Sequence, residues 1–175
     1  MKVAPNLYWK PAPPSSFTGK VHGPSWVLIG WEVAGPHAAA LGWHGANLVG
    51  WSNQIALQHV EFAVPGEPSQ RQPHPRVTIR SRKNLRRRDL TRLEATYLEA
   101  VIGFDRWCEG GWDQALSTTK IRLERSAENG EELPRADAVE RVAEYEWLRT
   151  GRDQFRSRMR DLVGVMTGCD QRAGG

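Results

Sequence analysis

The chain has 175 residues, with 24 Lys or Arg against 20 Asp or Glu, so its formal net charge is +4 at pH 7. This length predicts one domain, or two small ones, with a core large enough to fold without disulfide or metal staples. The longest apolar run is far shorter than the roughly 20 residues of a membrane span, so no membrane partner is expected.

The N-terminus has no apolar segment of the signal-peptide kind, and the two cysteines, Cys108 and Cys169, lie far apart in the sequence. Such sparse cysteine usage argues against a disulfide framework or a zinc ribbon. It is typical of a reducing compartment, so we expect a cytoplasmic protein.

Residues 1–25 are rich in Pro, Gly and Ser. Residues 7–9 (Leu-Tyr-Trp) predict a short strand, which Pro11 would end. The rest of this stretch is expected to be an extended arm.

The apolar run at residues 26–29 predicts either a buried strand or the start of a helix, because periodicity cannot separate the two over so few residues. Gly35-Pro36 then predicts a helix through residues 38–41, since proline suits a first helical turn. Gly42 and Gly45 are expected to end that helix.

Two segments then alternate as strands do, residues 54–64 and residues 77–82. In each, odd- and even-numbered side chains face opposite sides, which puts Arg80 and Arg82 together on one face. Because Pro65-Gly66 opens the loop between them, we predict an antiparallel hairpin.

The pattern changes to helical spacing after residue 89. Residues 91–94 (Thr-Arg-Leu-Glu) form a capping-box motif, and an amphipathic helix is predicted from there until shortly before Gly110. Three further helices are expected: one from Trp112 to near Asn129-Gly130, one from after Pro134 to a break at Thr150-Gly151, and one through Met166, followed by a frayed tail.

Strands first and helices last predict an α+β fold, with a small antiparallel or mixed sheet followed by a C-terminal bundle of about four helices. The expected organisation is an extended arm or link over 1–25, an α/β core with a basic hairpin over 26–88, a helical region packed on it over 89–167, and a flexible tail over 168–175. Together these segments are expected to form one compact unit.

Basic charge is concentrated in residues 71–92, which hold nine Lys or Arg and one acidic residue. A charge block of this kind usually meets an anion, here nucleic acid, a phosphorylated ligand or an acidic protein surface. The predicted contact residues are Arg76, Arg80, Arg82, Lys83, Arg86, Arg87, Arg88 and Arg92. The alternative is a solvated turn whose arginines pair with acids of the following helix, namely Glu94, Glu99, Asp105 and Glu109.

A second basic stripe recurs at helical spacing around the last helix: Arg149, Arg152, Arg156 and Arg160. Such a stripe can lie against a nucleic-acid backbone. Asp153 and Asp161 dilute it, so an ordinary solvated face is the preferred interpretation. The Thr150-Gly151 break is weak evidence for a helix-turn-helix, because many helical hairpins share it.

The residues give no positive sign of catalysis. The P-loop, GxGxxG, HExxH and GxSxG motifs are all missing from the sequence. His37 and His44 are expected two turns apart on one helix without further ligands, so packed histidines are predicted rather than a metal site. No catalytic residue, metal or cofactor is therefore predicted. A nuclease relative remains an alternative, although Glu61 is the only acid on the predicted strands.

Two segments, residues 33–66 and 77–101, resemble a known pattern. Its parts are a short helix with Gly35, Ala38, Ala39 and Leu41, a turn over 45–48, a strand ending in Pro65-Gly66, a strand with Ile79 and Arg80, and a helix opened by Leu90, Thr91, Glu94 and Ala95, with residues 7–10 as a link. This pattern is similar to the AbiEi-type antitoxin and transcriptional-regulator family of bacterial abortive-infection toxin–antitoxin systems, over most of residues 6–105.

The resemblance implies a non-enzymatic antitoxin domain. In that family an operator-binding winged helix-turn-helix precedes this domain, and the present sequence begins at the link, so operator binding is not expected. The implied partner is a cognate nucleotidyltransferase-like toxin, and the basic segment is the expected contact surface, for nucleic acid or for an acidic partner. The alternative function is a stand-alone regulatory module that binds DNA or RNA, with DNA the favoured nucleic acid. The oligomeric state stays open.

Overall fold

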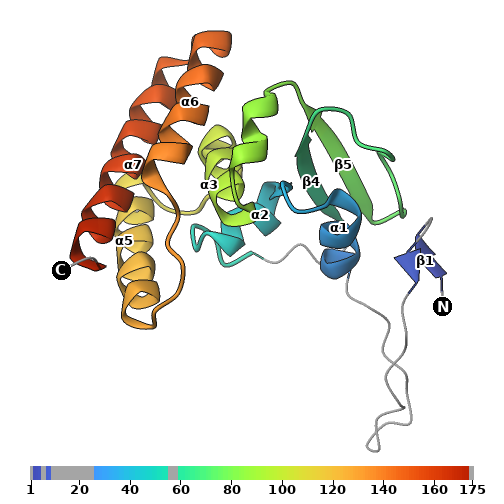
Figure 1. Ribbon diagram of the computed structural model, residues 1–175, viewed down its shortest axis with the longest axis horizontal. Helices are drawn as coiled ribbons and strands as arrows, with labels where there is room; N and C mark the ends of the chain where they lie inside the picture. The colour runs from blue at the N-terminus through green and yellow to red at the C-terminus, as the bar shows by residue number, and fades with distance from the viewer. Residues whose placement is uncertain (1, 5–6, 9–25, 55–58, 174–175) are drawn as a thin grey trace, which may run out of the picture.

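The computed structural model describes residues 2–4, 7–8, 26–54 and 59–173. The fold is α+β as predicted, with a three-stranded mixed sheet and helices concentrated in the C-terminal half. The sheet lies at one end of the molecule and the long C-terminal helices lie at the other (Figure 1).

A two-stranded antiparallel pair, β1 (Lys2–Ala4) and β2 (Leu7–Tyr8), precedes the core. The strand predicted at residues 7–9 is thus confirmed for 7–8, while Trp9 and the remainder of the arm lie outside the described residues. The ambiguous run that follows is helical, as α1 (Trp26–Ala34).

The helix predicted from Gly35-Pro36 is wrong. Gly35 instead ends α1 in a left-handed conformation (φ 86°), and its N–H donates to the Trp31 carbonyl over 2.9 Å. The following alanines form a short strand, β3 (Ala39–Ala40), which is the edge strand beside β4, and side chains this small allow its backbone to lie close to α3. Gly42 and Gly45, expected to close a helix, belong to α2 (Gly42–Leu48).

The two longer strands, β4 (Val60–Pro65) and β5 (Val77–Arg82), pair in parallel, from Val60 opposite Val77 to Pro65 opposite Arg82. The predicted antiparallel hairpin is therefore wrong. The proline-rich loop 66–76 is long enough to run back along the full length of β4 before β5 begins. β5 therefore starts beside the first residue of β4 and runs in the same direction. The Ile79 N–H donates to the Arg71 carbonyl over 2.7 Å, which holds this loop beside β5.

The two faces of the sheet differ in chemistry, as the alternation predicted. One face packs against α1, including its buried residue Ile29. This face consists of Val60, Phe62, Val64, Val77 and Ile79. The opposite face carries Ala63 and the polar side chains of Glu61, Arg80 and Arg82. Because β3 pairs with β4, Ala39 and Ala63 connect this second face to the helical core.

Downstream of the sheet lie a 3₁₀-helix, η1 (Leu85–Asp89), and the helices α3 (Arg92–Ile102) and α4 (Phe104–Trp107). The capping box is confirmed: Thr91 Oγ1 accepts from the Glu94 N–H, and the Glu94 carboxylate accepts from the Thr91 N–H over 2.7 Å. The single helix predicted here is interrupted at Gly103.

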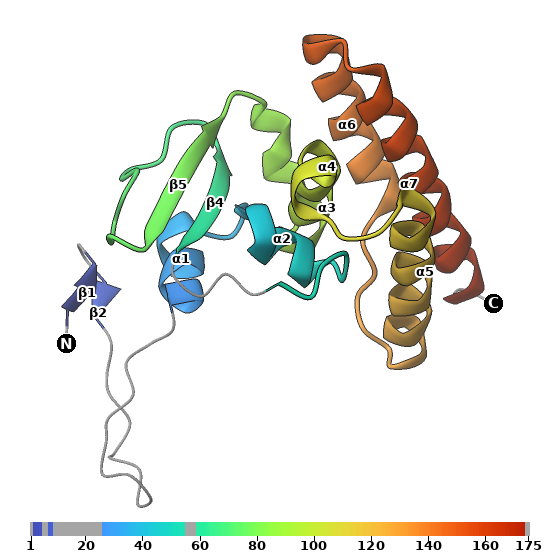
Figure 2. The ribbon, with the colours of Figure 1, turned by 180° about the vertical axis from the view of Figure 1, so that it is seen from behind.

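Three long helices complete the chain: α5 (Trp112–Glu128), α6 (Ala136–Thr150) and α7 (Asp153–Ala173). α5 and α6 each pack against α7, as both ribbon views show (Figures 1 and 2). The predicted break is confirmed by Gly151, which follows α6 in a left-handed conformation (φ 64°). The frayed tail predicted from residue 168 is wrong as far as residue 173, because α7 continues and buries Met166 and Cys169 in the helical core.

Candidate functional site

The basic segment 71–92 runs from the loop before β5 to the first turn of α3. Four of its cations form ion pairs with carboxylates of the same chain: Arg71 with Glu67, Arg80 with Glu61, Arg82 with Glu99, and Arg87 with Glu99 and Glu146. Among the described residues no carboxylate pairs with the other five, Arg76, Lys83, Arg86, Arg88 and Arg92. Internal pairing therefore accounts for part of the segment.

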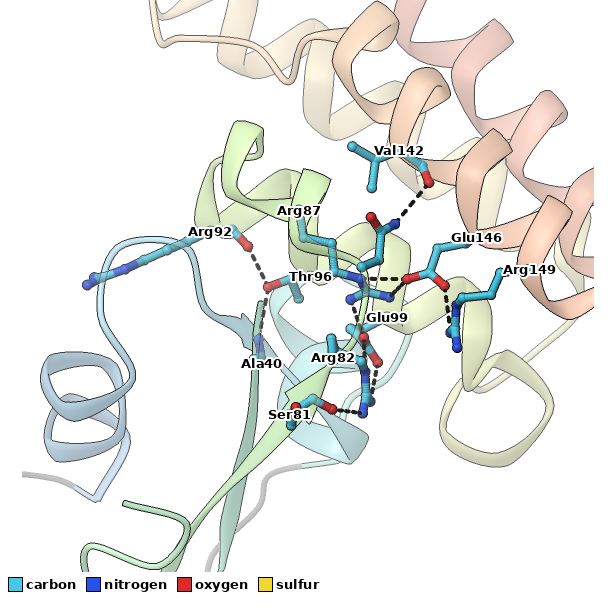
Figure 3. A network of polar contacts seen from close by, with 11 residues as sticks. Ala40, Ser81, Arg82, Arg87, Arg92, Thr96, Glu99, Val142, Glu146 and Arg149 are labelled. Atoms are coloured by element: carbon cyan, nitrogen blue, oxygen red, sulfur yellow. Dashed lines mark hydrogen bonds and ion pairs between the residues drawn. The ribbon is translucent and has the colours of Figure 1, made fainter. Parts of the chain in front are cut away.

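Arg87 lies at the centre of a buried ion-pair network (Figure 3). Its side chain is 3% exposed; Nε donates to Glu146 over 2.8 Å, and Nη1 donates to Glu99. The expectation that Arg87 belongs to an outward contact surface is therefore wrong. The buried guanidinium charge is not left unpaired, because the carboxylates of Glu99 and Glu146 surround it.

The network extends in both directions from Arg87. Arg82 binds Glu99 through two hydrogen bonds of 2.6 and 2.8 Å, and Arg149 donates to Glu146 over 2.9 Å. Arg82, Glu99, Arg87, Glu146 and Arg149 thus form a continuous chain of ion pairs from β5 to α6 (Figure 3). Residues of both predicted basic clusters meet here.

The local structure of η1 explains why only one of three consecutive arginines turns inward. A 3₁₀-helix advances one third of a turn per residue, so Arg86, Arg87 and Arg88 point in three directions. Asn84 fixes the start of η1, since its side chain accepts from the Arg86 N–H over 3.1 Å. Arg87 then faces α3 and α6, while Arg86 and Arg88 are exposed.

The arginines set the ionisation of the buried carboxylates. Burial alone would raise the pKa of Glu99, but hydrogen bonds and charge from Arg82 and Arg87 hold that pKa below its usual range. Burial also opposes ionisation of Glu146, and the charges of Arg87 and Arg149 lower its pKa in the same way. Both carboxylates are therefore anions at neutral pH.

Several of the unpaired arginines lie on aromatic rings. The guanidinium of Arg76 sits 5.1 Å from the Trp26 ring centroid, that of Arg92 5.1 Å from Trp31, and that of Arg86 4.6 Å from Tyr145. A stacked guanidinium keeps its charge and the donors at its edge, and its orientation is fixed before a ligand arrives.

Arg86 and Tyr145 form part of a mixed surface that we call the η1–α6 patch, made of Arg86, Tyr145, Leu148 and Arg149. Leu148 and Arg149 follow Tyr145 by three and four residues, so they share its helix face. Leu148 is 69% exposed and Tyr145 is 38% exposed. The patch therefore combines an apolar side chain, an aromatic ring and two guanidinium groups.

The second predicted stripe is divided. Arg149 joins the network, and Arg156 pairs with Glu144 over 3.3 Å while lying 3.6 Å from the Trp147 ring centroid. Within the described part of the chain, Arg152 and Arg160 have no carboxylate partner. The stripe is thus partly neutralised, by Glu146 and Glu144 and not by the aspartates within the stripe.

A cleft on the polar side of the sheet was not predicted from the sequence. This sheet–α4 cleft has a volume of about 510 Å³ and is lined by Leu41, Gly42, Trp43, His44, His59, Glu61, Arg80, Arg82, Glu99, Ile102, Gly103, Arg106 and Trp107. Its residues come from five elements separated in sequence, so no local motif could reveal it. The sequence predicted only that Arg80 and Arg82, which both line the cleft, share one face of a strand.

The two histidines are not on one helix. His37 is exposed in the turn before β3, whereas His44 lies in α2 and packs against Phe62. Burial lowers the pKa of His44, which favours the neutral imidazole. The described ranges contain no group of three or more His, Cys, Asp or Glu residues arranged to hold a metal ion.

In the described part of the chain, no helix combines the length and the apolar character needed to cross a membrane. Comparison with protein-family models, with curated proteins and with solved structures found no match for this chain. A functional assignment therefore rests on the residues and on the geometry given above.

Proposed function

We propose that the chain is a non-enzymatic antitoxin-type domain that binds an acidic surface of a partner protein through the η1–α6 patch. The observation that carries this proposal is the guanidinium of Arg86 held on Tyr145 beside the exposed Leu148. The resemblance to AbiEi-type antitoxins supplies the partner class, a nucleotidyltransferase-like toxin. The site of action is the cytoplasm, in keeping with two free cysteines.

The composition of the patch favours a protein over a nucleic acid. Binding hot spots between proteins are enriched in Arg and in aromatic residues, and their centres exclude water. Interfaces with DNA are more polar and much more positive. Leu148 is unsuited to a phosphate backbone, and four cations of the basic segment are already paired within the chain.

The test is co-expression with the product of the adjacent toxin-like reading frame, scored by growth and by the affinity of the purified pair. The double variant Arg86→Ala/Leu148→Ser is expected to abolish growth rescue and to weaken binding at least tenfold. A matched variant on the outer face of α5, Arg125→Ala/Ile121→Ser, removes the same chemistry from another exposed surface and should keep both. Full rescue by the patch variant contradicts the proposal.

The competing function is a DNA-binding module, favoured by the outward, unpaired Lys83, Arg86 and Arg88 around one turn. In that case the chain alone binds generic duplex at low salt, and its affinity falls with a slope of about −0.9 per phosphate contact. Arg86→Ala/Arg88→Ala would then weaken binding equally on all sequences. The full arginine triplet is a poor probe, because replacing Arg87 also opens the buried network.

A nuclease relative is the third alternative, and the combination of His44, His59 and Glu61 around one cleft gives it a location. Incubation of the purified chain with plasmid and with RNA, with and without divalent metal, tests it. Cleavage that survives in Arg86→Ala/Leu148→Ser but is lost in Glu61→Gln would replace the antitoxin proposal.

A further inference from the structure

The sheet–α4 cleft, which lies outside the η1–α6 patch, has aromatic walls. Trp43 of α2 and Trp107 of α4 meet edge to face, with ring centroids 5.5 Å apart. The guanidinium carbon of Arg106 lies 4.4 Å from the Trp107 ring centroid. Flat rings of a ligand stack on such surfaces, as bases do on aromatic side chains in nucleic-acid sites.

The two indoles differ from three of the other described tryptophans, although Trp26 and Trp31 share with them the lack of an indole N–H hydrogen bond among the described residues. Trp51, Trp112 and Trp147 donate their Nε1–H to Thr119, Asp161 and Asp153. Within the described residues, the indole N–H groups of Trp43 and Trp107 make no hydrogen bond, although both side chains are half-buried. A buried indole N–H usually donates to a hydrogen-bond partner. Since these two N–H groups have none among the described residues, both can donate to a ligand.

The polar wall of the cleft carries excess positive charge at its accessible edge. Arg80 is paired with Glu61 over 2.7 and 3.1 Å, yet its side chain remains 53% exposed. Arg106 makes no ion pair among the described residues and contributes a second accessible guanidinium. Deeper in the cleft, Arg82 is engaged by Glu99. Arginine at such an edge suits phosphate, which it binds with two parallel hydrogen bonds.

His44 adds an unsatisfied polar group to the same wall. In the described part of the chain, its Nε2 is the one buried side-chain nitrogen or oxygen without a hydrogen-bond partner. Buried polar atoms normally have a partner, so this unpaired nitrogen is an exception in a residue that lines the cleft.

We propose that the sheet–α4 cleft binds a small anion that carries a flat ring, of the nucleoside monophosphate class. The ring lies against Trp43 and Trp107, and the phosphate binds Arg80 and Arg106 at the rim. The volume of about 510 Å³ lies in the range of small-molecule pockets. A free nucleotide and the 5′-phosphorylated end of a single strand present the same chemistry.

The first experiment follows the indole N–H signals of the full chain by NMR while AMP, GMP, CMP or UMP is added. The signals of Trp43 and Trp107, assigned through Trp43→Phe and Trp107→Phe, are expected to shift, while those of Trp51 and Trp112 stay in place. The matching nucleosides should bind at least tenfold more weakly. Unmoved Trp43 and Trp107 signals at saturating nucleotide, or nucleosides that bind as well as nucleotides, overturn the proposal.

The second experiment uses the Glu61–Arg80 pair, whose members have opposite expected effects. Arg80→Gln removes a phosphate ligand and should raise the dissociation constant about tenfold. Glu61→Gln removes the carboxylate that competes for Arg80, and should lower the dissociation constant several-fold. A purely structural role would move both variants in the same direction, and that result overturns the proposal.

An exposed pair on α6, Asp137 and Arg141, provides the matched control, because Asp137→Asn and Arg141→Gln change the same charges away from the cleft. Both should leave the affinity unchanged. The source of the ligand is distinguished with a 5′-phosphorylated tetranucleotide and its unphosphorylated form. Tighter binding of the phosphorylated strand than of free nucleotide assigns the cleft to strand ends, and the reverse order assigns it to free nucleotides.

Discussion

Arg87 is held in the interior by two carboxylates, and its removal leaves Glu99 and Glu146 without their shared cation. Breaking a buried pair by deleting one partner costs about 3–5 kcal/mol, because the remaining charge is desolvated, and here Arg82 and Arg149 compensate the two carboxylates only in part. Arg87→Ala should therefore lower the free energy of unfolding by about this amount in urea titrations. Arg88→Ala, at an exposed position of the same turn, should change it by less than about 0.5 kcal/mol. Equal effects of the two substitutions would contradict the assigned role of Arg87.

The depressed pKa values of the buried glutamates predict an acid-labile fold. Arg135 lowers the pKa of Glu94 against the opposing effect of burial, as Arg82 and Arg87 do for Glu99. Groups whose folded pKa lies below the unfolded value of about 4.3 contribute stability above that pH, and lose it as pH falls through the folded pKa. The urea midpoint should therefore drop as pH falls below about 4.3. Glu99→Gln should flatten this drop, whereas Glu128→Gln, at an exposed position of α5, should leave its slope intact.

At the residue scale, the sequence predicted the location of the cations but not their partners. The charge block identified Arg80, Arg82 and Arg87, and the acids of the next helix were correctly considered as partners for the segment. Among the described residues, Glu99 is the one acid of that set that pairs with the segment, while Glu94 pairs with Arg135 and Asp105 pairs with Arg158. Partner choice depends on the packing of α6 and α7 against α3, which no local pattern encodes.

At the element scale, two glycines in helices have opposite packing environments. A Cβ on Gly30 of α1 would lie 1.9 Å from the Phe62 ring, in the core between α1 and the sheet, whereas one on Gly164 of α7 would meet nothing within 4 Å. Gly30→Ala should cost about 1–3 kcal/mol through overpacking. Gly164→Ala should add about 0.5–1 kcal/mol through helix propensity. Thermal unfolding of the two variants checks the signs, and stabilisation by Gly30→Ala would show that α1 does not pack as described.

Elements with long periodic patterns could be predicted, whereas those defined by tertiary contacts could not. The capping box and the amphipathic spacing located α3, α5, α6 and α7. The two residues of β3 carry no strand signal, because their pairing depends on β4 and on Thr96, whose hydroxyl accepts from the Ala40 N–H over 3.1 Å. Likewise, the parallel pairing of β4 and β5 follows from the path of loop 66–76.

At the scale of the whole molecule, the two hydrophobic clusters share one sheet. Phe62 packs toward α1 on one face, and Ala63 belongs to the helical core on the other. Since successive residues of β4 contribute to both clusters, the two should unfold together. Urea transitions followed by far-ultraviolet circular dichroism and by tryptophan fluorescence are expected to coincide. Separate midpoints would show that the sheet and the helical bundle are independent units.

Glu99 is part of the cleft wall and Arg149 is part of the η1–α6 patch, with only Arg87 and Glu146 between them. An anion that attracts Arg82 from within the cleft competes for the same guanidinium that Glu99 holds. With Arg82 drawn away, Arg87 would be the remaining cation paired with Glu99, and Arg87 also pairs with Glu146, the partner of Arg149. If a ligand in the sheet–α4 cleft changes the affinity of the η1–α6 patch for its partner, thermodynamic reciprocity requires that the partner change the affinity of the cleft for that ligand by the same factor.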